Sequence, residues 1–150
     1  REGTGNGAKL EIVGFGVWLG LGCEGGAADD MRSCHHFILS DYLPEGYVGV
    51  RDEYGDALFG GSEYFMADEV EVICVDGRSL LSLKVMEGAD FDPLQSAALY
   101  RFVGRTAVDR LKLIYRATRD GPSFDDFLRC VGDTKGLVFL IRKDKCVFGA

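Results

Sequence analysis

Long apolar runs are missing from this sequence of 150 residues. The longest uninterrupted run covers residues 137–141, whereas a helix that spans a bilayer needs roughly 20 residues. The N-terminal Arg-Glu-Gly-Thr-Gly-Asn-Gly also lacks the apolar core of a signal peptide. These absences predict a soluble protein. Because the first residue is not Met, we expect a processed product or a piece of a longer chain, whose upstream targeting information is left open.

Paired cysteines and histidines are also missing. The five cysteines are an odd number, lie far apart and form no C-x-x-C motif, which favours reduced thiols in the cytosol over a disulfide framework. Only Cys34, His35 and His36 cluster, with Cys23 nearby. Zinc ligands usually come in pairs about two to four residues apart, and neighbours on a strand point to opposite faces. Ordinary packing is therefore favoured over a metal site.

No other motif predicts catalysis. Cys130 lies in the last turn of a predicted helix, where the helix dipole opposes a thiolate. The glycines of residues 14–22 are spaced like those of a dinucleotide loop, but no helix pattern follows, which favours a strand. The acidic residues 52–56 lack the order of a calcium loop and favour a solvated turn. The sequence predicts no catalytic residue, no metal and no cofactor.

Positive charge is sparse in the first half of the chain. Residues 1–76 contain four Lys/Arg and fifteen Asp/Glu, a net charge of −11, and residues 77–150 contain thirteen and nine, a net charge of +4. The total of −7 argues against a nucleic-acid binder, which needs a dense basic surface. The two halves can attract each other across a shared core, or either can face a partner. A solvated acidic face is the simpler interpretation.

The first half is predicted to be rich in β-structure. It holds fourteen of the twenty-one glycines, and its apolar segments are short, as in strands separated by turns. Strands are expected at residues 9–14, 17–21, 36–39, 47–50 and 69–75. In the last strand, Val70 and Val72 alternate with Glu69 and Glu71, which is typical of one face on a core and the other largely in water.

The second half changes to helical spacing. Asp92 supplies an N-cap before Pro93, and apolar residues at helical intervals predict a helix over residues 94–102. Ser123 caps a second, short helix that ends at Gly132, because apolar residues follow it at i, i+3, i+4 and i+7.

Two further strands and a hairpin are expected around the second helix. Residues 111–116 alternate as a strand and end at a turn over residues 120–122. Residues 137–141 are apolar on both faces, which predicts a central strand. A polar turn at residues 142–145 leads to its hairpin partner at residues 146–148.

Five features of this half occur in a specific order. A helix is followed by a strand with Tyr-Arg and Arg-Asp-Gly, a short helix with Phe and Cys, a Lys-Gly pair before a buried strand, and a hairpin ending in Phe-Gly-Ala. They are residues 94–102, 113–121, 127–130, 135–136 and 148–150. This order resembles the opening half of a TLDc domain, over about sixty residues. Two positions depart from the family's pattern. Residues 131–133 are displaced in sequence relative to the family's Cys-Asp pair, and Leu137 occupies a position where the family usually has proline.

The first half resembles the closing half of the same family. Residues 59–72 resemble its Gly-Gly-Ser segment and final strand, and residues 15–21 resemble an earlier strand. The chain is thus predicted to form one TLDc-like domain over residues 1–150 with its halves in reverse order. Residues 1–76 resemble the family's closing half, and residues 77–150 resemble its opening half. The family's middle strands are partly missing. A circular permutant joined through residues 76–90 is favoured over two partial domains completed by a second chain, a form of domain swapping.

Five polar residues are singled out in these family-like segments: Arg116, Arg119, Asp120, Glu69 and Glu71. In a structural interpretation, Arg119 and Asp120 fix the strand exit and pair with the strand that carries the two glutamates. In a functional interpretation, the residues form a docking edge for a partner. The structural interpretation is favoured, because polar residues at strand ends commonly satisfy backbone groups and one another.

The expected fold class is α+β, a two-layer antiparallel β-sandwich with short peripheral helices. The resemblance implies a non-enzymatic, cytoplasmic protein-interaction domain, from a family associated with oxidative-stress resistance and with binding the peripheral part of the vacuolar proton-pumping ATPase. The competing hypothesis is a structural component of a larger protein assembly, whose acidic half docks on a basic neighbour. Neither hypothesis involves a cofactor, nucleic acid or membrane insertion.

Overall fold

The computed structural model describes residues 8–14, 16–23, 29–58, 60–76 and 110–149. The helix predicted at residues 94–102 lies outside the described residues, as does the predicted junction beyond Asp76. The described residues form eight strands in two antiparallel sheets of four, with a few short helices. None of the helices in these ranges combines the length and the apolar character needed to cross a membrane. The prediction of two antiparallel sheets with short helices is confirmed.

The first sheet comes entirely from the first half of the chain. Its order is β1-β2-β3-β4, where the strands are β1 (Leu10–Gly14), β2 (Val17–Leu21), β3 (Ser33–Ile38) and β4 (Tyr64–Met66). β1 and β2 form a hairpin in which Gly14 lies opposite Val17, and Gly16 adopts a positive φ of 74° at its turn. The first two predicted strands are therefore confirmed, and the glycine-rich stretch belongs to a β-hairpin.

The second sheet joins the two halves of the chain. Its order is β6-β5-β7-β8, where the strands are β5 (Glu69–Asp76), β6 (Arg110–Arg116), β7 (Leu137–Lys143) and β8 (Cys146–Gly149). β7 pairs with both β5 and β8, and its residues from Val138 to Ile141 are buried. The prediction that this apolar segment is a central strand with a hairpin partner is confirmed.

β5 is buried on both faces, which the sequence pattern did not predict. Val70 and Val72 on one face lie in the apolar core, and on the opposite face Glu71 is 2% exposed and Ile73 is 0% exposed. The expectation that the Glu71 face is largely in water is wrong. A period of two identifies the two faces of a strand, but it does not show what covers each face. A carboxylate on the second face therefore needs partners inside the protein.

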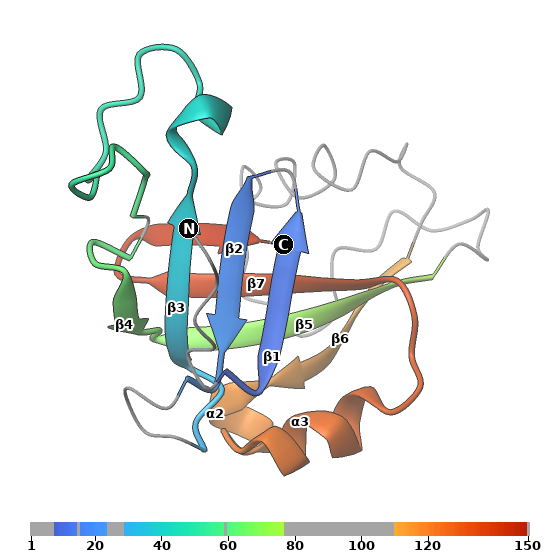
Figure 1. Ribbon diagram of the computed structural model, residues 1–150. Helices are drawn as coiled ribbons and strands as arrows, with labels where there is room; N and C mark the ends of the chain where they lie inside the picture. Colours follow the sequence, from blue (N-terminus) through green and yellow to red (C-terminus); the bar gives the residue numbers. More distant parts are fainter. Residues whose placement is uncertain (1–7, 15, 24–28, 59, 77–109, 150) are drawn as a thin grey trace.

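One apolar core lies between the two sheets. Figure 1 shows β1, β2 and β3 crossing in front of β5 and β7, so side chains from both halves of the chain meet between them. This arrangement is compatible with a two-layer β-sandwich. The core cluster is made of Leu19, Leu21, Met31, Cys34, Ala67, Val70, Val72, Tyr115, Ala117, Phe127, Val131, Phe139 and Ile141.

The chain crosses from one sheet to the other through two residues only. β4 ends at Met66 and β5 begins at Glu69. Of the two linking residues, Ala67 donates its backbone N–H to Arg32 beside the first sheet, and Asp68 donates its backbone N–H to Arg142 of the second. The two-residue link is thus held to each sheet by a backbone hydrogen bond.

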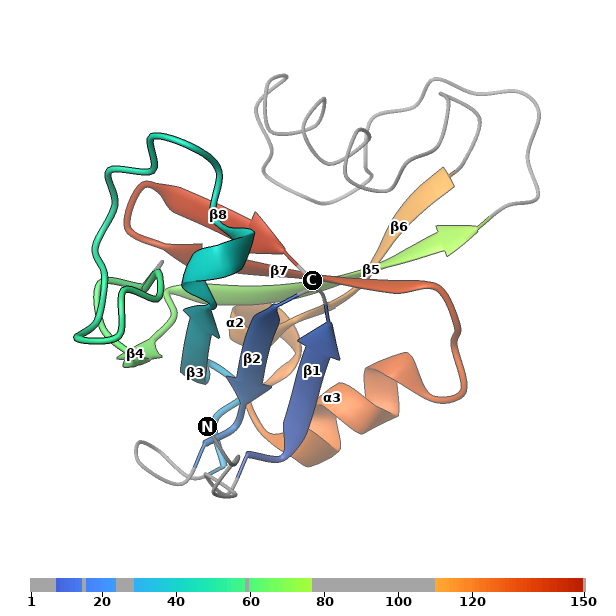
Figure 2. The same cartoon turned by 45° about the horizontal axis from the view of Figure 1, so that its top comes forward.

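Two short α-helices cover one end of the sheets (Figures 1 and 2). The helix α2 (Ala117–Asp120) follows β6 without a break, and α3 (Phe124–Val131) follows α2. Ser123 caps α3 by accepting a hydrogen bond from the Asp126 N–H at 3.1 Å, and Gly132 ends the helix at a φ of 51°. The predicted second helix is confirmed at both ends.

Several short elements differ from the predictions. No strand forms at residues 47–50, because no strand among the described residues pairs with this segment, which belongs to a loop that also contains the 3-10 helix η1 (Ser40–Tyr42). β3 begins three residues earlier than predicted, at Ser33. The three-residue β4 and the four-residue α2 were not predicted. Elements of this length are set by tertiary contacts more than by local sequence.

Candidate functional site

The five polar residues singled out from the sequence meet at one corner of the second sheet. Glu69 and Glu71 lie at the start of β5, Arg116 is the last residue of β6, and Arg119 and Asp120 end the adjoining helix α2. Antiparallel pairing places Glu71 directly opposite Arg116. We call these five residues, together with Thr118 and Arg142, the corner cluster.

Glu71 is the centre of the corner cluster. Its side chain is 3% exposed and accepts a hydrogen bond from Arg116 Nε at 2.8 Å through Oε1. Its other oxygen, Oε2, lies 3.6 Å from Arg142 Nη2. Arg142 was not among the residues predicted from the sequence. Its role depends on the pairing of β5 with β7, which local patterns do not reveal.

Glu69 binds the beginning of α2. Its Oε1 accepts a hydrogen bond from the Thr118 backbone N–H at 3.1 Å, and its Oε2 accepts one from the Thr118 hydroxyl. A carboxylate at this position satisfies a backbone donor that a helix leaves unpaired in its first turn. Glu69 therefore links β5 to the segment that follows β6.

Asp120 fixes the exit of β6. Its Oδ2 accepts a hydrogen bond from the Arg116 backbone N–H at 2.9 Å. Arg119 binds the same carboxylate in a bidentate manner, with Nε 2.8 Å from Oδ1 and Nη2 2.7 Å from Oδ2. The side-chain hydrogen bond from Arg119 holds the pKa of Asp120 below its usual value. The carboxylate thus stays ionised and acts as a fixed acceptor.

The pairing within the corner cluster differs from the structural interpretation in one respect. Arg119 and Asp120 bind each other, whereas the contacts to β5 come from Arg116 to Glu71 and from Thr118 to Glu69. The polar groups of the cluster are engaged with one another and with the backbone. This geometry favours a cluster that holds β5, β6, β7 and α2 together.

The Cys34, His35 and His36 segment lies on β3 and is buried. Cys34 belongs to the apolar core and shares a strand face with His36, whereas His35 lies on the other face and places Nε2 2.8 Å from Glu63 Oε1. Burial raises the pKa of the Cys34 thiol to about 12 and that of Cys23 to about 11. Both thiols are therefore protonated at neutral pH and are weak nucleophiles. The described residues contain no group of three potential metal ligands.

His36 gives the fold a dependence on pH. Burial, together with the nearby His35, lowers its pKa from 6.5 to about 4. Between these two values the unfolded chain binds a proton that the folded chain excludes, so the free energy of unfolding falls as the pH drops. We expect a loss of about 3 kcal/mol between pH 6.5 and pH 4 from this residue. Urea unfolding at a series of pH values measures it.

The matched comparison for this prediction is the variant His36→Gln. Removing the imidazole also removes its proton linkage, so the difference between the wild-type and variant pH profiles isolates His36 from the carboxylates that titrate at lower pH. The same slope in both proteins between pH 6.5 and pH 4 would contradict the prediction.

The loop over residues 39–58 carries most of the large apolar side chains that are exposed on the described surface. Val48 is 97% exposed, and the loop has one further apolar side chain at its start and three along its length. The full set is Leu39, Tyr42, Val48, Val50 and Tyr54. Single exposed apolar residues are ordinary, but five of the nine exposed large apolar side chains on the described surface belong to this one segment.

The loop is held in shape by its own carboxylates. Asp52 Oδ1 accepts hydrogen bonds from the backbone N–H groups of Tyr54 and Asp56, each at 2.9 Å. Asp56 is buried and accepts a 2.9 Å hydrogen bond from the Ser40 N–H through Oδ1. The acidic stretch predicted as a solvated turn therefore includes two carboxylates that organise the backbone.

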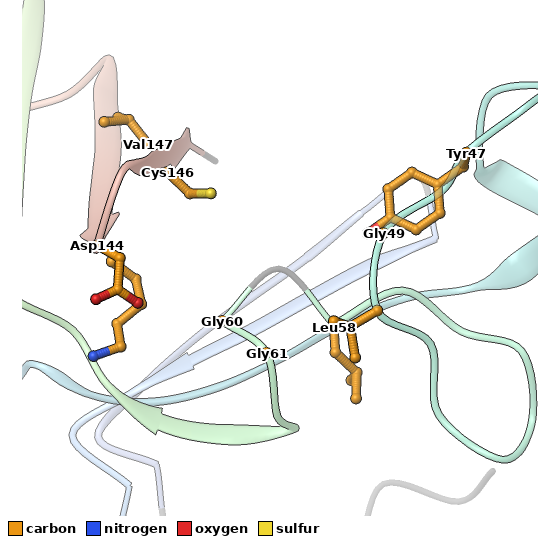
Figure 3. Close-up of a pocket in the computed structure, with 10 residues that line it drawn as sticks. Tyr47, Gly49, Leu58, Gly60, Gly61, Asp144, Cys146 and Val147 are labelled. Carbon is orange, nitrogen blue, oxygen red and sulfur yellow. The ribbon is translucent and has the colours of Figure 1, made fainter.

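A cleft separates the 39–58 loop from the hairpin of β7 and β8. Figure 3 shows Tyr47 and Leu58 on one side, Asp144 and Cys146 on the other, and Gly60 and Gly61 between them. The cleft has a volume of about 530 Å³. It is lined by Tyr47, Gly49, Val50, Leu58, Gly60, Gly61, Lys143, Asp144, Cys146 and Val147.

The described surface thus has one polar cluster that is engaged internally and one apolar loop beside a cleft. No family model, curated protein or solved structure matches this chain. The functional interpretation consequently depends on the residues themselves and on their geometry.

Proposed function

We propose that this chain is a cytoplasmic, non-enzymatic protein-interaction domain of the TLDc type, which binds and regulates the vacuolar proton ATPase or acts in oxidative-stress resistance. The resemblance of residues 94–150 and 59–72 to the two halves of that family is the basis for the family and the partner. The two antiparallel sheets are compatible with such a domain. The burial of the Cys23 and Cys34 thiols and the internally engaged corner cluster support a role in recognition over a role in catalysis.

The exposed apolar side chains of the 39–58 loop carry the proposal of protein binding. Tyrosine and aliphatic groups that a monomer leaves in water are stabilised when a partner covers them, at roughly 25 cal/mol per Å² of apolar surface. The loop is braced by the Asp52 and Asp56 carboxylates, so little conformational freedom is lost when a partner binds.

We also propose that the reversed order of the two halves is a circular permutation. The pairing of β5 with both β6 and β7 supports this idea, because residues from the closing and opening halves then complete one sheet within one chain. A chain completed by a second copy is the alternative. Sedimentation equilibrium separates the two, since a permutant is a stable monomer and a domain-swapped pair is a dimer.

The test of partner binding uses the purified chain and the isolated peripheral part of the vacuolar ATPase, immobilised on a biosensor. We expect the wild type to bind and the double variant Val48→Ser, Tyr54→Ser to bind at least about tenfold more weakly. Leu128→Ser is the matched control, because Leu128 is also exposed but lies on α3, at the other end of the molecule from the loop (Figure 1). Equal binding by all three proteins, or no binding by any, would overturn the proposal.

A structural role in a larger assembly is the second candidate. The acidic first half, with a net charge of −11, favours it, because such a surface suits a basic neighbour. Cross-linking in cells followed by mass spectrometry separates the candidates. Cross-links from the 39–58 loop to pump subunits support the first candidate, and cross-links to scaffold or cytoskeletal proteins support the second.

A further inference from the structure

The cleft beside the 39–58 loop borders an open sheet edge. In the order β6-β5-β7-β8, β8 is the last strand, and within the described ranges only β7 pairs with it. Cys146 and Val147 of β8 both line the cleft. An edge strand presents unpaired backbone N–H and C=O groups, which an extended segment of another chain can pair with.

The walls of the cleft can take side chains from such a segment. Tyr47, Val50 and Leu58 supply apolar surface on the loop side, and Figure 3 shows Cys146 pointing into the space between the two sides. Gly60 and Gly61 form the part between, and a Cβ built on Gly61 would meet no atom within 4 Å, so a backbone can approach there. The cleft thus combines a strand edge with an apolar recess, the two elements that strand addition uses.

The charges around the loop side define the chemistry of the occupant. Glu45 and Glu53 flank the lining residues Tyr47 and Val50, are exposed, and form no ion pair with any described residue. Two of the basic groups nearby, Arg51 and Lys143, are engaged within the chain, whereas Lys145 in the turn of the β7–β8 hairpin is exposed. Arg51 donates to the Gly55 carbonyl at 2.7 Å and lies over the Tyr47 ring, and Lys143 Nζ lies 3.6 Å from Asp68 Oδ1.

We propose that this cleft binds an extended, lysine-rich or arginine-rich segment of a protein partner, which adds a strand to β8 and places apolar side chains against Tyr47, Val50 and Leu58. This inference rests on the proposed function, since it names the chemistry of the partner that the loop recognises. The uncompensated carboxylates attract the basic side chains and set the partner's orientation, and backbone pairing with β8 holds the segment extended.

The test measures fluorescence anisotropy of a labelled short peptide that alternates lysine and valine, titrated with the full chain at low and raised salt. We expect saturable binding that weakens with salt, and no binding of the same peptide with glutamate in place of lysine. The double variant Glu45→Lys, Glu53→Lys is expected to bind the lysine peptide about tenfold more weakly.

The matched control is the double variant Glu11→Lys, Asp133→Lys, which changes the net charge equally through exposed acidic residues outside the loop. It is expected to bind the lysine peptide like the wild type, apart from a small effect of net charge. Circular dichroism confirms that both double variants are folded. Equal binding of the lysine and glutamate peptides, equal loss in both double variants, or self-association that Glu45→Lys, Glu53→Lys abolishes would overturn the inference.

Failure here is distinguishable from failure of the proposed function. If the chain binds the pump's peripheral part but not the lysine peptide, the basic-segment inference is wrong and the proposed function stands. If it binds the lysine peptide with the expected dependence on Glu45 and Glu53 but not the pump, the inference stands and the proposed partner is wrong.

Discussion

Replacing Glu71 with alanine is expected to lower the free energy of unfolding by about 3 kcal/mol. The variant leaves Arg116 and Arg142 at the buried end of the corner cluster without the carboxylate that both approach. Removing one partner of a buried ion pair costs more than the pair contributes, because the remaining charge stays desolvated. The expected loss is at the low end for buried pairs, since both arginine side chains keep partial contact with water.

Urea unfolding followed by circular dichroism measures this loss as a shift of the transition midpoint. Glu53→Ala is the control, because it removes an exposed glutamate and should change stability by no more than about 0.5 kcal/mol. A second variant, Glu71→Leu with Arg116→Met, tests the mechanism. It should be more stable than Glu71→Ala, since it removes the Arg116 charge along with the carboxylate and leaves only the Arg142 charge without the Glu71 carboxylate. A loss for Glu71→Ala no larger than that of Glu53→Ala would contradict the prediction.

Replacing Phe127 with alanine is expected to destabilise the protein by about 4 kcal/mol. Phe127 is buried where α3 meets the second sheet, and its ring centroid lies 5.5 Å from that of Tyr115 and 5.9 Å from that of Phe139. Alanine would leave a cavity between a helix and two strands that are fixed by sheet pairing, so the surrounding side chains can fill it only in part.

Thermal and urea unfolding measure the effect of Phe127→Ala. Leu128→Ala is the neighbouring control, because Leu128 is exposed on the same helix and its replacement should cost no more than about 0.5 kcal/mol. If both variants unfolded at the same midpoint, α3 would contribute little to the shared core, contrary to its position in the structure.

Local sequence was sufficient to predict the elements whose signals lie within one segment. α3 is the clearest case, since the cap Ser123, the apolar spacing to Val131 and the end at Gly132 are all adjacent in sequence. β2 was predicted with its exact bounds, because glycine turns border it. The central position of β7 followed from the unbroken apolar run at residues 137–141.

Features that depend on pairing between segments far apart in sequence were not predicted. The segment at residues 47–50 is a short apolar stretch like a strand, but no described strand lies beside it, and Gly46 at a φ of 78° turns the chain just before it. The short β4 exists because β3 offers it an edge, with Cys34 opposite Phe65. The β-propensity of one segment does not indicate whether a partner strand is present.

The candidate site was also only partly predictable. The five polar residues were found because they lie in family-like segments, whereas Arg142 joins them through strand pairing between β5 and β7. The burial of Glu71 was also not predicted, because a glutamate in an alternating pattern normally indicates the solvent-exposed face of a strand. The cleft beside β8 could not be foreseen, because it forms between a loop and a hairpin that are far apart in sequence.

The two-residue crossing at Ala67 and Asp68 has a consequence for the nascent chain. Every strand of the first sheet has left the ribosome once Met66 emerges, whereas β5 emerges next and must wait for β6 and β7, which begin at Arg110 and Leu137. During that interval β5 offers two open edges and the apolar Val70 and Val72 to other molecules. Until β6 and β7 emerge, β5 and the inner face of the first sheet, which carries Leu19 and Leu21, both expose apolar groups of the shared core.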